Sequence, residues 1–385
     1  MIIAIDLTYN PYGGSLAQIL NILKYIQNDK RFEYIIFCSK KNHLQFEQYE
    51  SSNVIFKISS ISSLNKFSRI IWTQLVLPFS LLRNRASILF CPGNFSPIMA
   101  FTKKIQWIGT VGPFENDFYQ GFSSKEKINL IFNKIIMILS ALTSSHVIFE
   151  SRYTRDLFIN KYGFRKERSS VINLGRDEYF YQTEELQSEI LKRYLGKRFL
   201  LSVSHLYPYK NLEVLFHSIK NIEDKDIICL IAGKFHTPEY QLKLIHLAKN
   251  LNIEERIHFI GGVSKEELRD LYSNCEILVF TSPFENFAYT LVEAMSCGSA
   301  IIASNTTAMP ETCEDAVIYF NPYSAEELTE EINHLLLNTH VMDDYRKKAL
   351  KRSYEINTYE EANIKTTEVL RLGLLTATLL TPLLK

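Results

Sequence analysis

The sequence predicts an α/β protein made of two parallel-sheet domains. At 385 residues the chain is longer than one hydrophobic core usually organises. Short apolar runs rich in β-branched residues alternate with segments of helical length, which is typical of a parallel sheet with helices on both faces. This alternation occurs twice, separated by a polar stretch. We therefore expect two Rossmann-like domains facing across a cleft, at residues 1–180 and 199–360, joined by a linker at 181–198.

The first series of elements defines the N-terminal domain. A strand at residues 2–7 is followed by apolar spacing that predicts a helix over 16–27. Further strands are expected at 34–39, 54–58, 87–92, 105–111 and 145–151.

The second series defines the C-terminal domain. Its strands are expected at 199–204, 227–233, 256–262, 276–282, 299–304 and 316–321. Beyond about residue 326 the pattern is helical, and residues 361–385 form a C-terminal helix or tail. The Leu-rich end, 371–385, is either a helix packed back on the first domain or a membrane-facing tail.

Charge is distributed unevenly along the chain. Residues 1–180 hold 22 Lys and Arg against 13 Asp and Glu, a net charge of +9, whereas the remainder holds 21 against 29, a net charge of −8. A basic half suits an anionic membrane surface or a phosphorylated acceptor. The alternative is that the two oppositely charged domains attract each other.

The sequence gives no sign of secretion or of a membrane-spanning helix. Six scattered cysteines without CxxC spacing are typical of buried thiols in a reducing compartment. The longest membrane-like run, residues 135–142, is far shorter than the roughly 20 residues that a spanning helix needs. We expect a cytoplasmic protein, either free or peripheral at the inner face of the membrane. Residues 68–85 are either a core helix or a membrane contact.

Two glutamates follow the predicted strand at 276–282. In parallel sheets, ligands bind beyond the carboxyl ends of strands, where helix N-termini offer backbone N–H groups. Glu285 lies in the loop after this strand and Glu293 on the next helix. Backbone N–H groups from Phe287 to Leu291 would face a phosphate, and Glu293 would accept hydrogen bonds from a ribose. The alternative is that Glu285 is an N-terminal helix charge and Glu293 a solvated residue.

The segment FENFAYTLVEAMSCGSAIIASNTTAMPE resembles the signature of retaining GT-B glycosyltransferases of family 4, also described as glycosyl transferases group 1. Glu285, Glu293, Gly298, Pro310 and Glu311 fit the signature. The resemblance implies GT-B architecture, with Glu285 contacting the donor sugar and Glu293 the nucleotide ribose. One residue departs from the pattern: Asn286 replaces a glycine, and asparagine tolerates left-handed backbone angles better than most residues.

A second motif, LLSVSHLYPYKNLEVL, follows the strand at 199–204. The resemblance makes Lys210 the cation that binds the donor diphosphate and stabilises the charge left when the glycosidic bond breaks. The family often has arginine where His205 stands, so this second positive contact becomes weaker or pH-dependent. Without the resemblance, Lys210 reads as a surface lysine.

The resemblance covers residues 199–322 almost without a gap. Gly233 and Lys234 match a phosphate-side element, and the turn from Gly261 to Val263 matches the nucleotide-base site. Glu285 and Lys210 are the expected catalytic residues. The expected donor-binding residues are His205, Lys210, Asn211, Gly233, Lys234, Gly261, Gly262, Val263, Glu285, Asn286, Phe287, Ala288, Tyr289, Thr290, Leu291 and Glu293.

The N-terminal half resembles the family more loosely. Gly13 and Gly14 lie in a turn between the first strand and helix, on the acceptor or phosphate side of the cleft. Many family members carry a His-Asp pair after the strand at 105–111, but this sequence continues GPFEND. The histidine is missing, and Pro113 and Phe114 are the residues expected to shape the acceptor site there.

The predicted function is retaining transfer of a sugar from a nucleotide diphosphate donor to a glycan or lipid-linked glycan in envelope polysaccharide synthesis. No metal, cofactor or nucleic acid is expected. Phosphate-loop, nucleophile-elbow and zinc-protease motifs are absent. Two alternatives remain: a sugar-nucleotide epimerase on a similar scaffold, and a non-catalytic partner in a polysaccharide assembly complex.

Overall fold

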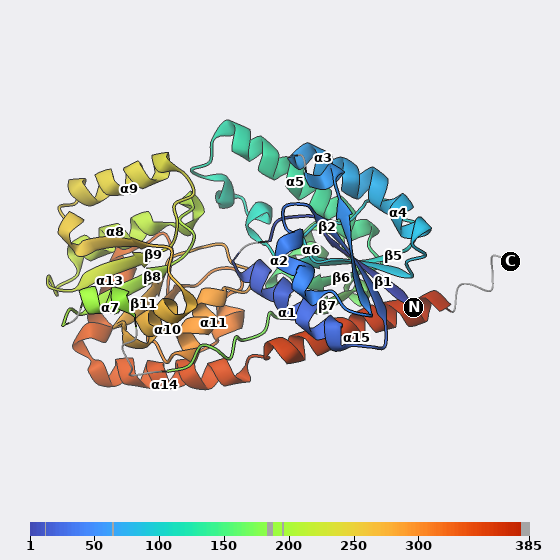
Figure 1. Ribbon diagram of the computed structural model, residues 1–385. Coiled ribbons are helices and arrows are strands. Elements are labelled where there is room, and N and C mark those ends of the chain that lie inside the picture. The colour runs from blue at the N-terminus through green and yellow to red at the C-terminus, as the bar shows by residue number, and fades with distance from the viewer. Residues whose placement is uncertain (12, 64, 183–187, 195, 379–385) are drawn as a thin grey trace. The chain divides into compact units, whose positions relative to one another are not determined.

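The computed structural model shows two compact units (Figure 1). It describes residues 1–11, 13–63, 65–182, 188–194 and 196–378. Unit 1 consists of Met1–Pro113, Lys125–Gly175 and the chain from Asn357 onward. Unit 2 consists of Phe114–Ser124 and Arg176–Ile356.

These units differ from the predicted domains in three places. The main change of unit comes at Gly175, before the linker expected at 181–198, and the chain returns to unit 1 after Ile356. In addition, residues 114–124 belong to unit 2 although they interrupt the first half of the chain. The differences arise from packing between segments far apart in sequence, which local patterns do not report.

Unit 1 contains a seven-stranded parallel sheet of order β3-β2-β1-β4-β5-β6-β7. Its strands are β1 (Ile2–Leu7), β2 (Glu33–Ser39), β3 (Val54–Ser59), β4 (Ile88–Cys91), β5 (Lys103–Ile108), β6 (His146–Phe149) and β7 (Ser169–Val171). All six predicted strands are present. The seventh, β7, was not predicted because it has three half-buried residues and lacks an apolar run.

Helices cover this sheet. They are α1 (Gly14–Asn28), α2 (His43–Phe46), α3 (Lys66–Ile71), α4 (Leu77–Arg83), α5 (Ser124–Thr143), α6 (Arg152–Tyr162) and α15 (Tyr359–Thr378). A π-helical turn, Trp72–Val76, joins α3 to α4.

The C-terminal helix α15 packs on unit 1, beside α1, β4 and β5 (Figure 1). Leu370 and Leu374 are buried there. Gly373 lies so close to Ile88 that a β-carbon would stand 2.6 Å from its Cδ1 atom. For residues 371–378 the packed helix is therefore the correct alternative, and residues 379–385 lie outside the described residues.

Unit 2 contains a six-stranded parallel sheet of order β10-β9-β8-β11-β12-β13. The strands are β8 (Phe199–Val203), β9 (Ile228–Ala232), β10 (Ile257–Gly261), β11 (Ile277–Phe280), β12 (Ile301–Ser304) and β13 (Ile318–Phe320). All six were predicted, because apolar residues dominate each of them.

Helices pack on this sheet, and some of them share a hydrophobic core with it. The helices are α7 (Glu189–Arg193), α8 (Leu212–Asn221), α9 (Pro238–Asn250), α10 (Lys265–Asn274), α11 (Tyr289–Ser296), α12 (Met309–Cys313), α13 (Ala325–Leu337) and α14 (Thr339–Glu355). Leu215 of α8, Ile231 of β9 and Leu328 of α13 are fully buried in this core. The six cysteines of the chain are buried and free, as predicted.

Candidate functional site

Lys210 and Glu285 meet at the carboxyl edge of the unit 2 sheet. Lys210 ends the short turn after β8, and Glu285 lies in the loop after the adjacent strand β11. The Lys210 ammonium donates to Glu285 Oε1, and the two side chains are only 14% and 16% exposed. The ammonium also lies 5.1 Å from the centre of the Tyr209 ring. Lys210 is therefore a mostly buried, paired cation and not an ordinary surface lysine.

Two hydrogen bonds fix the loop that carries Lys210. The Thr281 hydroxyl, just after β11, donates to the Lys210 carbonyl at 2.7 Å. The Asn211 side-chain amide donates to the Pro322 carbonyl at 2.6 Å. Asn211 has a left-handed φ of 55°, which asparagine tolerates well. Asn211, expected to bind the donor, thus makes a contact that positions Lys210.

The Glu285 loop is held by the loop that follows β12. The Glu285 N–H donates to Thr307 Oγ1 at 3.1 Å, and the Thr306 hydroxyl donates to the Pro283 carbonyl at 2.8 Å. The left-handed residue of this loop is Ala288, with a φ of 49°, and not Asn286. Asn286 is instead a buried residue with ordinary backbone angles. The left-handed angle that asparagine would tolerate is therefore carried by Ala288.

The first turn of α11 adds backbone donors next to Glu285. The helix begins at Tyr289, and its first turn directs backbone N–H groups, such as that of Thr290, toward this end. Such N–H groups and the helix dipole favour an anion at this end. Phe287 is buried, and its ring contacts that of Tyr289 with centres 5.5 Å apart. Leu291 packs into the core.

Glu293 lies on the second turn of α11 with a perturbed pKa. Its Oε2 accepts a hydrogen bond from the Tyr272 hydroxyl at 3.1 Å. Burial raises the pKa of Glu293 from its ordinary value of 4.5 to about 7, although the Tyr272 hydrogen bond and Lys265 oppose this effect. A carboxylate in this setting gains from further hydrogen-bond donors. Glu293 is thus a mostly buried acceptor and not the solvated residue of the alternative reading.

Glycines bring the loops after β8, β9 and β10 close together. Gly233 has a φ of 141°, and a β-carbon there would overlap the Ser204 carbonyl. The Gly233 N–H donates to the Gly261 carbonyl at 2.7 Å. A β-carbon on Gly262 would stand 2.9 Å from Lys234 Cε, so the Lys234 side chain covers that glycine. Val263 follows as a half-buried residue.

His205 lies in the loop after β8. Partial burial, together with the nearby charges of Lys210 and Lys234, lowers the pKa of His205 below its ordinary value of 6.5. The ring is therefore mostly neutral near pH 7. A second positive contact from His205 to a donor stays a prediction.

An aromatic segment at residues 114–124 packs beside Lys210, and the sequence reasoning missed it. The Phe118 ring lies 5.0 Å from Tyr209 and 5.8 Å from Phe284 between centres. The Tyr207 ring also stacks on that of His236, with centres 4.1 Å apart. The signal was present in the run of aromatic residues from 114 to 122.

The residues expected on the acceptor side divide between the units. Gly13 caps α1 with a φ of 56° and ψ of −136°, angles that favour glycine, and Gly14 is the first residue of the helix. Pro113 belongs to unit 1, whereas Phe114 belongs to unit 2 and is completely buried. The Gly13 turn is as predicted, but Pro113 and Phe114 do not lie in one unit.

Unit 1 has buried acidic groups at the carboxyl edge of its sheet that the sequence reasoning did not single out. Asp6 of β1 accepts from the Thr8 hydroxyl at 2.7 Å, and burial raises the Asp6 pKa despite this bond. Glu150, directly after β6, accepts from Trp107 Nε1 at 2.9 Å. The available signal was an acidic residue at or just after the end of these two apolar strands, β1 and β6.

Comparisons with known proteins agree with this geometry. Residues 183–352 match the family model "Glycosyl transferases group 1". The chain is 27% identical over 234 residues to the serotype-specific mannosyltransferase WbdA of Escherichia coli, covering 60% of this chain and 28% of WbdA. It is 24% identical to the O-antigen chain mannosyltransferase RfbU of Salmonella typhimurium, covering 51% of this chain and 52% of RfbU. The chain thus spans between about a quarter and half of these relatives.

A solved structure extends the likeness to nearly the whole chain. HepE of Anabaena in complex with UDP has a TM-score of 0.74 and 19% identity, covering 96% of this chain and 99% of HepE. This confirms the predicted fold class of two Rossmann-like units. Residues 183–352, which lie in the second unit, thus resemble the glycosyl transferases group 1, and the chain has the fold of GT-B glycosyltransferases.

Proposed function

We propose that the protein is a retaining glycosyltransferase that moves a sugar from a nucleotide diphosphate donor to a glycan or lipid-linked glycan acceptor. The observation that carries the proposal is the Lys210–Glu285 pair at the carboxyl edge of the unit 2 sheet, next to the α11 N-terminus. A cation, a carboxylate and a helix N-terminus at one sheet edge suit a substrate with a diphosphate and sugar hydroxyls.

In this proposal each group has a separate role. Lys210 and the α11 N–H groups neutralise the diphosphate as the glycosidic bond breaks, and Glu285 contacts the donor sugar. Glu293 accepts hydrogen bonds from the ribose hydroxyls, while the turn from Gly261 to Val263 holds the base through backbone groups. The described residues hold no cluster of three or more His, Cys, Asp or Glu suited to a metal ion. We propose metal-independent transfer because Lys210 and the α11 N–H groups supply the positive charge that would otherwise come from a metal ion.

The proposed reaction retains the configuration of the sugar. The departing phosphate oxygen accepts the proton of the acceptor hydroxyl on the same face, so no protein nucleophile forms a covalent intermediate. Lys210 stabilises the phosphate charge while Glu285 holds the sugar in position. Exclusion of water from the site would limit hydrolysis of the donor.

The relatives suggest a donor to test, and the charge of the N-terminal half suggests where the acceptor is met. WbdA and RfbU are mannosyltransferases by name, so nucleotide-linked mannose is the first donor to test. No described helix has the length and hydrophobicity needed to cross a bilayer. The basic N-terminal half suits a cytoplasmic protein held peripherally at an anionic membrane, where a lipid-linked acceptor would be presented.

Nucleotide binding tests this proposal directly. Calorimetry of the purified protein with UDP, GDP and ADP, and with their sugar conjugates, should show binding of one nucleotide family in the presence of EDTA. Loss of that binding on addition of EDTA would overturn metal independence. Absence of binding to every nucleotide would instead favour the non-catalytic alternative, and conversion of a nucleotide sugar without an acceptor would favour the epimerase.

Glu293→Gln should stabilise the free protein while weakening nucleotide binding. The Glu293 pKa is about 7 in the folded state, above its ordinary 4.5, so the folded protein binds a proton that the unfolded chain has released. The free energy of unfolding therefore falls as pH rises from 4.5 to 7, by up to about 3 kcal/mol. Glutamine does not ionise, so the variant avoids this fall in the free energy of unfolding. Its amide oxygen accepts weaker hydrogen bonds from the ribose than a carboxylate does.

The measurement is chemical denaturation of both proteins across this pH range. The stability gain of the variant should be small near pH 4.5 and largest above pH 7. A gain that is independent of pH would show that Glu293 does not carry the raised pKa. Calorimetry on the same samples should show weaker nucleotide binding by about tenfold.

A further inference from the structure

Unit 1 exposes an unusual number of large apolar side chains in three short segments: residues 66–85, 97–104 and 124–143. Eleven of the 23 large apolar side chains that are exposed among the described residues lie in these 48 positions. They are Phe67, Leu75, Phe79, Leu82, Met99, Phe101, Ile128, Ile131, Phe132, Ile135 and Leu139. Single exposed apolar residues are ordinary, whereas such a concentration marks an interaction surface. We call these eleven side chains the apolar face.

On α5 the exposed residues form a continuous helical stripe. Ile128, Ile131, Phe132, Ile135 and Leu139 occupy positions i, i+3, i+4, i+7 and i+11, so they lie on one side of the helix. The residues that α5 buries include Met137, Ser140 and Ala141. A helix on the surface of a soluble protein normally presents charged residues to water. Here the side away from the core is apolar as well.

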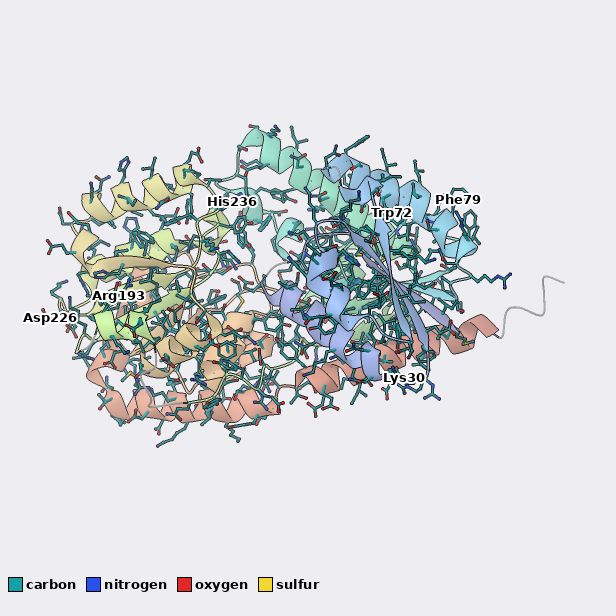
Figure 2. The ribbon with its side chains drawn as sticks, in the orientation of Figure 1. Lys30, Trp72, Phe79, Arg193, Asp226 and His236 are labelled. Atoms are coloured by element: carbon teal, nitrogen blue, oxygen red, sulfur yellow. The ribbon has the colours of Figure 1, made fainter. Side chains whose placement is uncertain are left out.

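The segment from α3 to α4 repeats this arrangement. Leu75, Phe79 and Leu82 are exposed at helical spacing, while Trp72, Leu77 and Leu81 of the same segment are buried (Figure 2). The Phe79 ring contacts that of Phe101 with centres 5.6 Å apart, which joins α4 to the 97–104 loop. Residues 68–85 are thus both a core element and an exposed apolar surface.

A cavity shows that the two helical segments are neighbours. It has a volume of about 180 Å³ and is lined by Ile70, Thr73 and Gln74 from one segment and by Asn133 and Ile136 from α5. Arg69 and Phe95 complete its lining. The Arg69 guanidinium lies 5.4 Å from the Tyr9 ring and 5.8 Å from the Phe95 ring, and its buried Nε has no hydrogen-bond partner among the described residues. A positive charge therefore lies between the segments that carry the apolar face.

The charge of these segments decides between the possible occupants. They hold nine Lys and Arg against one acidic residue, Glu126, although the whole chain has 43 against 42. Arg83, Arg85 and Lys125 are exposed beside the apolar residues. A second copy docked on the same face would bring like charges together. An anionic lipid surface offers negative headgroups to the basic residues and an apolar interior to the apolar ones.

We propose that this face of unit 1 binds an anionic membrane surface, with the apolar stripes of α5 and of the α3–α4 segment entering the acyl-chain boundary. The proposal deepens the proposed function and rests on it for its biological setting, because a lipid-linked acceptor would be met at that surface. The binding itself is a property of unit 1 and needs no nucleotide. The elements that contact the membrane in this proposal are α5 and the α3–α4 segment.

Vesicle sedimentation tests the proposal with the full chain. Wild type should bind vesicles of phosphatidylcholine mixed with phosphatidylglycerol, and binding should weaken in high salt and on neutral phosphatidylcholine vesicles. The variant Phe79→Ser/Phe132→Ser/Ile135→Ser should bind the mixed vesicles about tenfold less tightly or worse. The control Leu44→Ser/Leu242→Ser/Leu337→Ser, at exposed apolar positions elsewhere, should bind like wild type.

The outcomes separate this proposal from its alternatives. Equal vesicle binding by the two triple variants, or no binding by wild type, would overturn the membrane face. A wild-type dimer in solution that becomes monomeric only in the Phe79/Phe132/Ile135 variant would show that a second copy occupies the face. Nucleotide calorimetry on the same wild-type preparation tests the proposed function separately. Vesicle binding without nucleotide binding would overturn the proposed function and leave the membrane face in place.

Discussion

Replacement of Lys210 by alanine should lower kcat for sugar transfer by about a hundred- to a thousandfold, the usual cost of removing one donor that stabilises developing charge. The Lys210 side chain is 14% exposed and aromatic rings lie beside it, so its charge is less screened than that of a surface lysine. Steady-state kinetics with the donor identified by calorimetry measure the effect.

Two controls distinguish a catalytic loss from a loss of stability. Lys192 forms an exposed ion pair with Glu189 at 2.6 Å on α7 of the same unit, so Lys192→Ala removes a paired lysine from an element without site residues. It should leave kcat unchanged. The double variant Lys210→Ala/Glu285→Ala leaves no unpaired carboxylate, so it should recover part of any stability lost in Lys210→Ala. It should remain as inactive, and recovery of activity in the double variant would contradict a catalytic Lys210.

Glu285→Gln should separate nucleotide binding from catalysis. In the free protein Glu285 holds the Lys210 ammonium, so a diphosphate must compete with this carboxylate for the same cation. Glutamine removes the competitor, and we expect a nucleoside diphosphate to bind about threefold to tenfold more tightly. Transfer should nevertheless fall by about a hundredfold or more, because glutamine cannot stabilise positive charge that develops on the donor sugar.

Calorimetry and kinetics on the same Glu285→Gln preparation check this split. The matched control is Glu189→Gln. It removes the exposed carboxylate that pairs with Lys192 on α7, an element without site residues, and it should change neither quantity. Weaker nucleotide binding in Glu285→Gln would show that Glu285 supports the diphosphate site directly. Sugar transfer by Glu285→Gln at the wild-type rate would show that Glu285 is not a catalytic residue.

The sequence alone is sufficient to predict most of the two sheets. The twelve predicted strands are apolar runs, and some of them, such as β4 and β11, are buried along their whole length. The three-residue strand β7 is stabilised by pairing with β6 and leaves no such signal. The membership of residues 114–124 in unit 2 was equally hidden, since Phe118 reaches Tyr209 across about ninety positions of chain.

The candidate site was predictable in its residue types but not in its contacts. Lys210, Glu285 and Glu293 follow strands, and their resemblance to a known signature identified them. The partners that hold them, Thr281 and Tyr272, come from other elements and become neighbours only through folding. The left-handed angle at Ala288 also opposes local preference, because alanine rarely adopts it.

The chain crosses from one unit to the other four times, and this path has a consequence for folding on the ribosome. Multidomain proteins generally fold from the N-terminus as each domain emerges. Here unit 2 has all its residues once Ile356 has been made, whereas unit 1 still lacks α15, which covers β4 and β5. Unit 1, whose synthesis begins first, is therefore the unit whose synthesis is completed last. Until then, the nascent chain displays the apolar surface that Leu370 and Leu374 will cover, and chaperones that bind such surfaces have their longest access there.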